Sequence, residues 1–326
     1  TVYTKERRMR LWQQFMIYLA RNPSIKTFMH SRAALSELAR RFVGGSTPLK
    51  GVKKAQTLAG KGFKSSLFNL GEYVEDRSVI QQTVSDLKAA AGHLADSGLD
   101  VHISVDPTQI GLQIDPAFCR ENAAELACAV KNNTGREGAG PQVVLMLDME
   151  DATVAQATLD LYTGLVRQEL PVGITLQAYL HRTRQDIASV IVRSGMVRLV
   201  KGAFAESSHI AYTRKEAINA SYLDLAGMML SEKARANGFY PVFATHDHKM
   251  IEKIIVTAQK NGWEKGSYEF ELLYGVRTAL QEQLVQSGET VRLYLPFGTD
   301  WWPYAIRRVG ETPKNIRFLL NALFKS

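Results

Sequence analysis

Two patterns of apolar residues follow one another along this chain. In residues 6–42 the side chains of Leu11, Phe15 and Leu19, and later those of Leu35 and Leu38, recur at helical spacing. A Gly-Gly-Ser-Thr-Pro turn at residues 44–48 ends this pattern. Beyond the turn, short β-type runs alternate with longer amphipathic stretches, which predicts eight strands separated by helices. The expected strands are residues 65–70, 101–105, 143–147, 174–177, 197–200, 242–244, 268–271 and 292–295. The expected helices include residues 79–94, 117–131, 154–168, 215–236 and 248–261.

This alternation of strands and helices is typical of a parallel sheet covered by helices. Eight such units match a closed β/α barrel better than an open sheet. The chain has no internal repeat, low-complexity tract or long linker. We therefore expect an α/β fold, with a helical N-terminal extension at residues 1–60 and an eight-stranded β/α barrel that carries the functional site at residues 61–326.

A barrel localises function, because active sites lie at the C-terminal ends of its strands. The residues at or just past each expected strand are polar almost every time, although each position taken alone is equally typical of an ordinary loop. They are Gly71-Glu72, Asp106, residues 148–151, Gln177, Lys201-Gly202, residues 245–248, Glu271 and Tyr294. Together they predict a polar cup at one end of the barrel.

The composition narrows the class of protein. With 326 residues, of which 45% are hydrophobic and 22% charged, the chain can bury a core of barrel size. Its net charge of +8 suits an anionic substrate, an anionic cofactor, nucleic acid or a membrane surface. The basic residues are spread over helix-like segments rather than gathered in one patch with aromatic residues, so we expect no nucleic acid as a partner. Contact with the periphery of a membrane stays open.

The two cysteines bear on the compartment. Cys119 and Cys128 lie nine positions apart on one expected helix, so they face opposite sides and cannot pair. Two unpaired thiols favour a reduced, cytoplasmic compartment. No apolar run approaches the roughly 18 residues of a membrane span. Because the chain begins with Thr1 rather than Met, prior removal of a targeting segment also stays open.

Several familiar site motifs are absent. His246 and His248 lack the spacing of helical zinc ligands and no cysteine lies near them, so we expect no metal. No glycine-rich dinucleotide-binding turn, phosphate-binding loop or serine nucleophile elbow occurs in the right context. In the acidic run at residues 148–151, Glu150 and Asp151 fit the start of a helix, whereas Asp148 at the strand tip is the better functional candidate. Arg307 and Arg308 form a guanidinium pair suited to a carboxylate, although a basic surface helix has the same pattern.

The order of nine short segments resembles the proline dehydrogenase family from about residue 50 to the end. The segments are residues 68–72 (FNLGE), 103–112 (ISVDPTQIGL), 147–151 (LDMED), 176–183 (LQAYLHRT), 198–204 (RLVKGAF), 244–247 (ATHD), 268–275 (YEFELLYG), 294–298 (YLPFG) and 304–311 (YAIRRVGE). The resemblance implies a distorted, TIM-like barrel, non-covalently bound FAD, and hydride transfer from an amine-bearing carbon to flavin N5.

The resemblance also implies roles for individual residues. Arg198 resembles the arginine that contacts flavin N5, and Asp148 the acidic residue that orders the active site from beneath, so these two are the catalytic candidates. The residues that resemble cofactor-binding positions, beside Arg198, are Met149, Gln177, Lys201, Gly202, Ala203, Thr245 and His246. Those that resemble substrate-binding positions are Asp106, Tyr294, Tyr304, Arg307, Arg308 and Glu311. Glu311 lies one helical turn beyond the arginines, where it would orient them.

Two positions depart from the family pattern. Asp106 stands where the family usually has a lysine that helps to hold the substrate carboxylate, and Glu271 stands where it usually has a glutamine. Both changes make the cup more acidic. They fit either a substrate with an extra cationic or donating group, or a local rearrangement in which Asp106 pairs with Arg307.

The sequence leaves three functions to be distinguished. The first is FAD-dependent oxidation of L-proline to pyrroline-5-carboxylate, with a quinone or another compound as the final electron acceptor. The second keeps the fold and the flavin but oxidises a different amino acid or secondary amine. The third is a basic binding module without catalysis, which the spread of basic residues disfavours.

Overall fold

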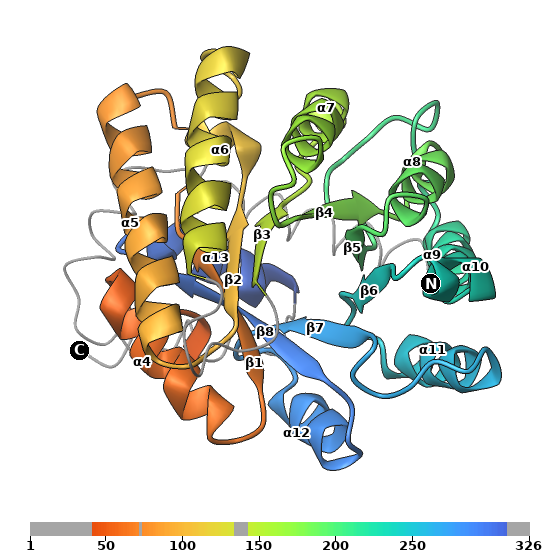
Figure 1. Ribbon diagram of the computed structural model, residues 1–326. Coiled ribbons are helices and arrows are strands. Elements are labelled where there is room, and N and C mark those ends of the chain that lie inside the picture. Colours follow the sequence, from red (N-terminus) through yellow and green to blue (C-terminus); the bar gives the residue numbers. More distant parts are fainter. Residues whose placement is uncertain (1–40, 72–73, 134–142, 312–326) are drawn as a thin grey trace.

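Eight parallel strands close into a barrel in the order of the sequence (Figure 1). The computed structural model describes residues 41–71, 74–133 and 143–311. The strands are β1 Lys64–Asn69, β2 Val101–Val105, β3 Val143–Leu147, β4 Val172–Gln177, β5 Met196–Val200, β6 Tyr240–Phe243, β7 Glu269–Leu273 and β8 Val291–Phe297. Strand β8 pairs with β1, with Tyr294 beside Ser66, and so closes the ring. The predicted β/α barrel is therefore confirmed.

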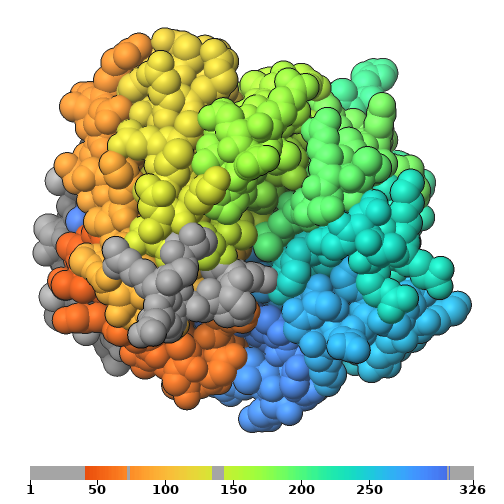
Figure 2. Space-filling view, viewed as in Figure 1, coloured from red at the N-terminus to blue at the C-terminus, as the bar shows by residue number. Residues whose placement is uncertain are grey.

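Helices cover the outside of the barrel (Figures 1 and 2). They are α4 Pro48–Ala59, α5 Arg77–Asp96, α6 Pro116–Asn132, α7 Ala155–Val166, α8 Thr183–Ile191, α9 Lys215–Met229, α10 Glu232–Ala236, α11 His248–Lys260, α12 Thr278–Gln286 and α13 Trp301–Glu311, with a short 3-10 helix η1 at Pro107–Ile110. In the space-filling view the colours follow one another around the molecule, as expected when consecutive units are neighbours. No helix within the described ranges is long and apolar enough to cross a membrane.

The helix expected at residues 215–236 is two helices. Helix α9 ends at Met229, and Ser231 begins α10 by accepting a hydrogen bond from the backbone N–H of Ala234 at 3.2 Å. Helices α8 and α12 have nine residues each and offer too few helical repeats to be recognised by spacing. Cys119 and Cys128 both lie on α6, the first buried and the second exposed, and neither forms a disulfide.

The part of the expected N-terminal extension that is described packs on the barrel. Thr47 begins α4, and its hydroxyl accepts a hydrogen bond from the backbone N–H of Lys50 at 3.4 Å. Helix α4 contacts β1, β8 and α5, and Gly45 pairs with Phe297 of β8. Residues 45–59 therefore pack against the strands of the barrel. Residues 1–40, with most of the expected first helices, lie outside the described residues.

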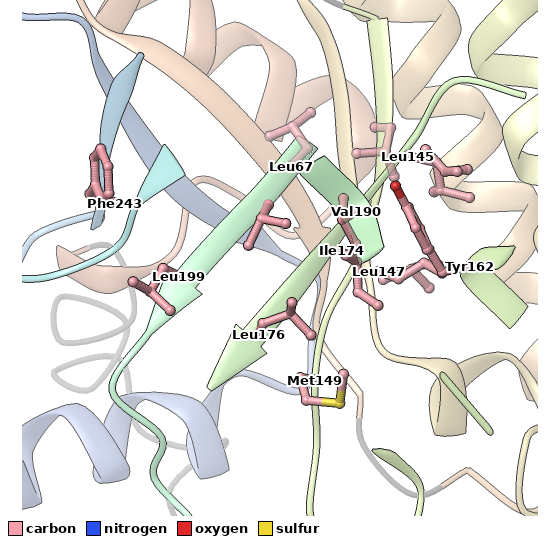
Figure 3. Packing of buried hydrophobic residues seen from close by; sticks show 14 of the residues in the cluster. Leu67, Leu145, Leu147, Met149, Tyr162, Ile174, Leu176, Val190, Leu199 and Phe243 are labelled. Carbon is pink, nitrogen blue, oxygen red and sulfur yellow. The ribbon is translucent and has the colours of Figure 1, made fainter. Parts of the chain in front are cut away.

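The two faces of each strand carry different kinds of buried side chain. Leu145, Leu147, Ile174, Leu176 and Leu199 belong to the large apolar cluster between the strands and the outer helices (Figure 3). Complete burial of such a side chain stabilises the fold by about 1.5–3 kcal/mol. Because side chains alternate along a strand, the residues between them face the barrel interior. There a small separate cluster of Val144, Met146, Met196 and Val242 lies among polar residues.

A buried ionic network is found toward the N-terminal ends of the strands. Arg292 of β8 donates hydrogen bonds to Glu269 at 2.7 Å, to Asp100 at 2.8 Å and to the carbonyl oxygen of Ser65 at 2.9 Å. Lys64, which is 30% exposed, reaches Asp100 at 3.1 Å. Burial disfavours the charged form of Arg292, but the carboxylates of Glu269 and Asp100 outweigh burial and raise its pKa. Arg292 therefore stays charged and links β7, β8 and the start of β2.

Arg292→Met tests this network. The substitution leaves Glu269 and Asp100 buried without their shared cation, so we expect the free energy of unfolding to fall by about 3–5 kcal/mol. Urea unfolding followed by circular dichroism measures the loss. Lys64→Met removes a partly exposed partner of Asp100 and should lower stability by only about 0–1 kcal/mol. Equal losses in the two variants would contradict a central role for Arg292.

Candidate active site

Arg198 of β5 is the centre of a buried polar cluster near the C-terminal ends of the strands. Its side chain is 3% exposed. Nη1 donates to Asp148 Oδ1 at 2.5 Å, Nε donates to Glu271 Oε2 at 2.7 Å, and Nη2 donates to Ser104 Oγ at 2.8 Å. The guanidinium therefore binds side chains from the ends or interiors of three other strands.

The remaining N–H groups of Arg198 also point at protein oxygens. Nη1 lies 3.4 Å from Thr175 Oγ1, and Nη2 lies 3.4 Å from Ser66 Oγ. Ser66 is in turn bonded to Ser104 at 2.7 Å and to His102 Nδ1 at 2.9 Å. Burial opposes the charged form of Arg198, but Glu271 and Asp148 outweigh it and raise its pKa. A permanent positive charge is thus fixed in one orientation.

Asp148, directly after β3, has the most donors in this cluster. Beside Arg198, it accepts hydrogen bonds from Thr175 Oγ1 at 2.9 Å and from the hydroxyl of Tyr294 at 2.9 Å. The ring of Tyr294 lies 5.4 Å from the guanidinium carbon of Arg198 and 5.2 Å from the ring of Phe68. Burial, and then the charges of Asp148 and Asp106, raise the pKa of Tyr294 well above its usual value, so its phenol keeps its proton.

Glu271 lies on the other side of the guanidinium and is 2% exposed. Burial raises the pKa of its carboxyl to about 7, although the nearby Arg198 opposes the shift. The sequence predicted Glu271 and Tyr294 at strand ends. Both instead lie within their strands, because β7 continues to Leu273 and β8 to Phe297. They therefore line the barrel interior beneath the cup.

Gln177 ends β4 at the rim of this cluster. Its Nε2 donates to the carbonyl oxygens of Met149 at 3.2 Å and Glu150 at 3.0 Å. Its buried Oε1 has no hydrogen-bond partner among the described residues. The side chain of Met149 belongs to the outer apolar core (Figure 3), and its backbone carbonyl oxygen is the part bonded to Gln177.

The segment after β5 brings a cation and a tight turn to the rim. Lys201 Nζ donates to Asn219 Oδ1 at 2.8 Å and lies 3.4 Å from Asp247. Gly202 has a φ of +103°, and a Cβ there would lie 2.2 Å from the ring of Tyr179. Only glycine fits this close approach. Ala203 follows and is exposed.

Thr245 and His246 follow β6. Thr245 is buried, and its hydroxyl accepts a hydrogen bond from the backbone N–H of Asp247 at 3.2 Å. His246 Nε2 accepts from the backbone N–H of Leu273 at 3.1 Å, which places the ring proton on Nδ1. Burial, and then the charges of Arg308 and Arg277, lower the pKa of His246 to about 4, so it is neutral at neutral pH. Within the described residues no group of three or more acidic, histidine or cysteine side chains is arranged to hold a metal ion.

The last helix, α13, supplies the expected substrate residues. Tyr304 is buried, and the guanidinium carbon of Arg308 lies 5.1 Å from the centre of its ring. The influence of Arg308 on His246 places this helix near the end of β6. The side chains of Arg307 and Glu311 lie outside the described residues, so their roles stay predictions.

Asp106 follows β2 and is half-buried, close enough to influence the pKa of Tyr294. The turn after it is held by Glu150, which accepts hydrogen bonds from Thr108 N at 2.9 Å and Thr108 Oγ1 at 2.5 Å. The sequence suggested that Glu150 and Asp151 begin a helix, but α7 begins at Ala155, and Asp151 accepts from Thr153 N at 2.9 Å in the turn before it. Glu150 is instead buried and joins two strand-end loops.

Sequence reasoning missed several residues that support Arg198. Ser66, Ser104 and Thr175 bond to it, and Glu150 holds the neighbouring loop. The signal that would have found the first three is alternation. A polar side chain at every second position of an apolar run marks the interior face of a barrel strand.

Known proteins share both the sequence and the fold of this chain. The profile of the family described as proline dehydrogenase matches residues 51–320. This chain belongs to the proline dehydrogenase family. Proline dehydrogenase 2 of Bacillus subtilis is 31% identical to it over 287 residues, covering 88% of this chain and 90% of that protein. The proline dehydrogenase of Deinococcus radiodurans is 30% identical over 319 residues, covering 97% of this chain and 98% of that protein. The chain is thus an oxidoreductase of this family.

Solved structures agree with the barrel. Proline utilization A (PutA) from Bdellovibrio bacteriovorus, inactivated by N-propargylglycine, aligns with a TM-score of 0.72 at 23% identity. PutA from Bradyrhizobium japonicum aligns with a TM-score of 0.70 at 21% identity. The first alignment covers 88% of this chain and 33% of that PutA chain, so this chain spans about a third of its length. At this identity the likeness supports the fold alone.

Glu150→Ala tests the link between the two loops of the site. The substitution leaves the buried N–H and hydroxyl of Thr108 without their acceptor, so we expect the free energy of unfolding to fall by about 1–3 kcal/mol. Chemical unfolding measures it. Glu150→Gln keeps an acceptor oxygen and should lose less. If both variants lost the same stability, the charge of Glu150 rather than its hydrogen bonds would be responsible.

Proposed function

We propose that this chain oxidises L-proline to pyrroline-5-carboxylate by hydride transfer to N5 of a bound FAD. The observation that carries the proposal is Arg198, a buried, permanently charged guanidinium locked by Asp148 at the end of the barrel where active sites lie. Membership of the proline dehydrogenase family supports the substrate and the reaction. The matched segments include every residue assigned below.

The residues at the rim fit a flavin. Gln177 offers a buried acceptor oxygen that no described residue uses, Gly202 permits close approach of the backbone, and Lys201 supplies a cation. When bound, the flavin ring supplies a two-electron acceptor for the hydride. The residues that would hold it are Met149, Gln177, Arg198, Lys201, Gly202, Ala203, Thr245 and His246.

The protein's own contribution is orientation and electrostatics. A hydride leaves the carbon beside the amine nitrogen and the nitrogen loses a proton, so a carbon–nitrogen double bond forms. Negative charge develops on the acceptor at the same time. Arg198 is held in place for that charge before the reaction begins, and such preorganised charge needs little rearrangement in the transition state. Asp148 and Tyr294 fix its position.

The substrate carboxylate is the ligand proposed for α13. Arg307 and Arg308 are its guanidinium partners, Glu311 orients them, and Tyr294 and Tyr304 form aromatic walls. Adjacent guanidinium groups bind a carboxylate with charge-assisted hydrogen bonds. A quinone or another compound is the proposed acceptor of the electrons afterwards, with the protein in the cytoplasm or at the periphery of a membrane.

A second candidate function keeps the flavin and changes the substrate. Its basis is Asp106, a carboxylate at the end of β2 that is close enough to influence the pKa of Tyr294, at a position where the family pattern usually has a lysine. An amino acid or secondary amine with an extra cationic or donating group would be attracted to the carboxylate of Asp106. The two candidates differ in substrate and share the remaining machinery.

Arg198→Ala tests the proposed chemistry. The purified protein should be yellow, with a flavin spectrum that bleaches when L-proline is added without oxygen. In the variant we expect flavin reduction to slow by about 100- to 1000-fold, the order measured when one preorganised donor is removed from a transition state. Stopped-flow absorbance measures the rate, and circular dichroism checks the fold. A near-normal rate in a folded variant would refute the assignment.

Asp106→Lys distinguishes the two substrates. If Asp106 binds a cationic group, an ion pair at about 4 Å contributes about 4 kcal/mol at an effective dielectric of 20 before desolvation, enough to change preference tenfold or more. We then expect low kcat/KM for L-proline in the natural protein and a rise of about tenfold in the variant. Asp106→Asn separates the loss of charge from its reversal. An already efficient natural enzyme that becomes worse on substitution would leave L-proline as the substrate.

A further inference from the structure

The cluster around Arg198 contains one more carboxylate than it has cations. Asp148 and Glu271 both bond to this guanidinium, and no other lysine or arginine among the described residues bonds to either. The network beneath is balanced, because Arg292 and Lys64 face Asp100 and Glu269. Two ionised carboxylates on one buried cation leave a surplus negative charge, and a buried group avoids such a charge by binding a proton.

The hydrogen bonds indicate which carboxylate binds the proton. Asp148 accepts hydrogen bonds from three donors, namely Arg198, Thr175 and Tyr294. Glu271 accepts only from Arg198 Nε, through Oε2. Its Oε1 is buried and has no partner among the described residues. With one donor, and with a buried oxygen that no described residue contacts, Glu271 is the carboxylate of the pair that binds the proton.

Charged groups on two neighbouring strands, β2 and β7, favour the same assignment. The ionisable groups in or beside the two interior networks are Lys64 on β1, Asp100 before and His102 on β2, Asp148 after β3, Arg198 on β5, Tyr240 on β6, Glu269 and Glu271 on β7, and Arg292 and Tyr294 on β8. Burial, and then the charges of Arg292 and Arg198, lower the pKa of His102, so it brings no compensating positive charge. Glu269 adds a second negative charge on the same strand, and burial together with this charge outweighs Arg198 and raises the pKa of Glu271 to about 7.

We propose that Glu271 is a positioning residue for Arg198 that holds a proton in the folded protein, and that loss of this proton places a surplus negative charge beside the guanidinium. The protonated form accepts the Nε–H of Arg198 without cancelling its charge. The ionised form opposes the stabilisation that Arg198 gives to a negative charge at the reaction face. This consequence for catalysis rests on the proposed function, whereas the location of the proton does not.

The sign of the effect on stability follows from linkage. The pKa of Glu271 is about 7 in the folded protein against 4.5 for an ordinary glutamate, so between these values the folded state holds a proton that the unfolded state has released. The stabilising contribution is complete below about pH 4.5 and is lost progressively up to about pH 7. Relative to Glu271→Gln, the unfolding equilibrium constant of the natural protein should rise about tenfold per pH unit over this interval.

Two measurements test whether Glu271 holds the proton, and neither depends on the enzymatic activity of the protein. In infrared difference spectra at pH 6, the natural protein should show the carbonyl band of a protonated buried carboxyl group, and Glu271→Gln should lack it. Urea unfolding between pH 5 and pH 8 should show the extra pH dependence in the natural protein only. The exposed Glu282→Gln on α12 is the matched control and should keep both the band and the pH dependence.

Asp148→Asn provides an independent variant. It leaves Glu271 as the sole carboxylate on Arg198, so Glu271 should ionise and the infrared band should disappear even though the glutamate is present. For catalysis, the rate of flavin reduction should fall as pH rises through about 7 in the natural protein, and this limb should be absent in Glu271→Gln. A band and a stability profile unchanged by Glu271→Gln would overturn the proposal. Lack of proline oxidation with the band present would instead refute the proposed function and leave the proton where we place it.

Discussion

A guanidinium buried inside a barrel needs a hydrogen-bond acceptor for each N–H group and negative charge close to its own positive charge. The interior of this protein is arranged around that requirement. Arg198 is 3% exposed, and each of its N–H groups points at an oxygen from another strand or the loop after it. The desolvation of an unpaired charge would exceed what the apolar core contributes at any single position. The serine and threonine partners, the tyrosine against its face and the two carboxylates are therefore parts of one unit.

The barrel permits such a unit because it separates two kinds of interior. Apolar side chains on the outer face of the strands pack against helices (Figure 3), and they hold the structure together without regard to the chemistry inside. The inner face is then free to be polar. In this chain it contains a balanced network around Arg292 and, toward the C-terminal ends, an unbalanced one around Arg198. The two networks therefore occupy different layers of the same barrel.

The sequence predicted some strands at their observed bounds and placed other residues wrongly. The short runs at residues 101–105 and 143–147 predicted β2 and β3 at their observed bounds, because apolar β-forming runs bounded by polar residues leave little ambiguity. Strands β7 and β8 continue further than predicted, and Glu271 and Tyr294 changed from rim to interior as a result. Glu150 looked like a helix-start acid, but its partner Thr108 lies 42 residues away in sequence, a contact that local patterns do not encode.

The sequence by itself determined the barrel, the order of its units, the family and the candidates Asp148 and Arg198, because periodicity and motif order are found along the chain without knowing which residues meet in space. Only the tertiary structure decided which side chains share one space. The closure of β8 onto β1 brings Tyr294 and Asp148 within 2.9 Å although 146 residues separate them. The proton that we assign to Glu271 also depends on the tertiary structure, namely on burial, on the number of donors and on the balance of charge. These are properties of the closed barrel interior and not of the residue type.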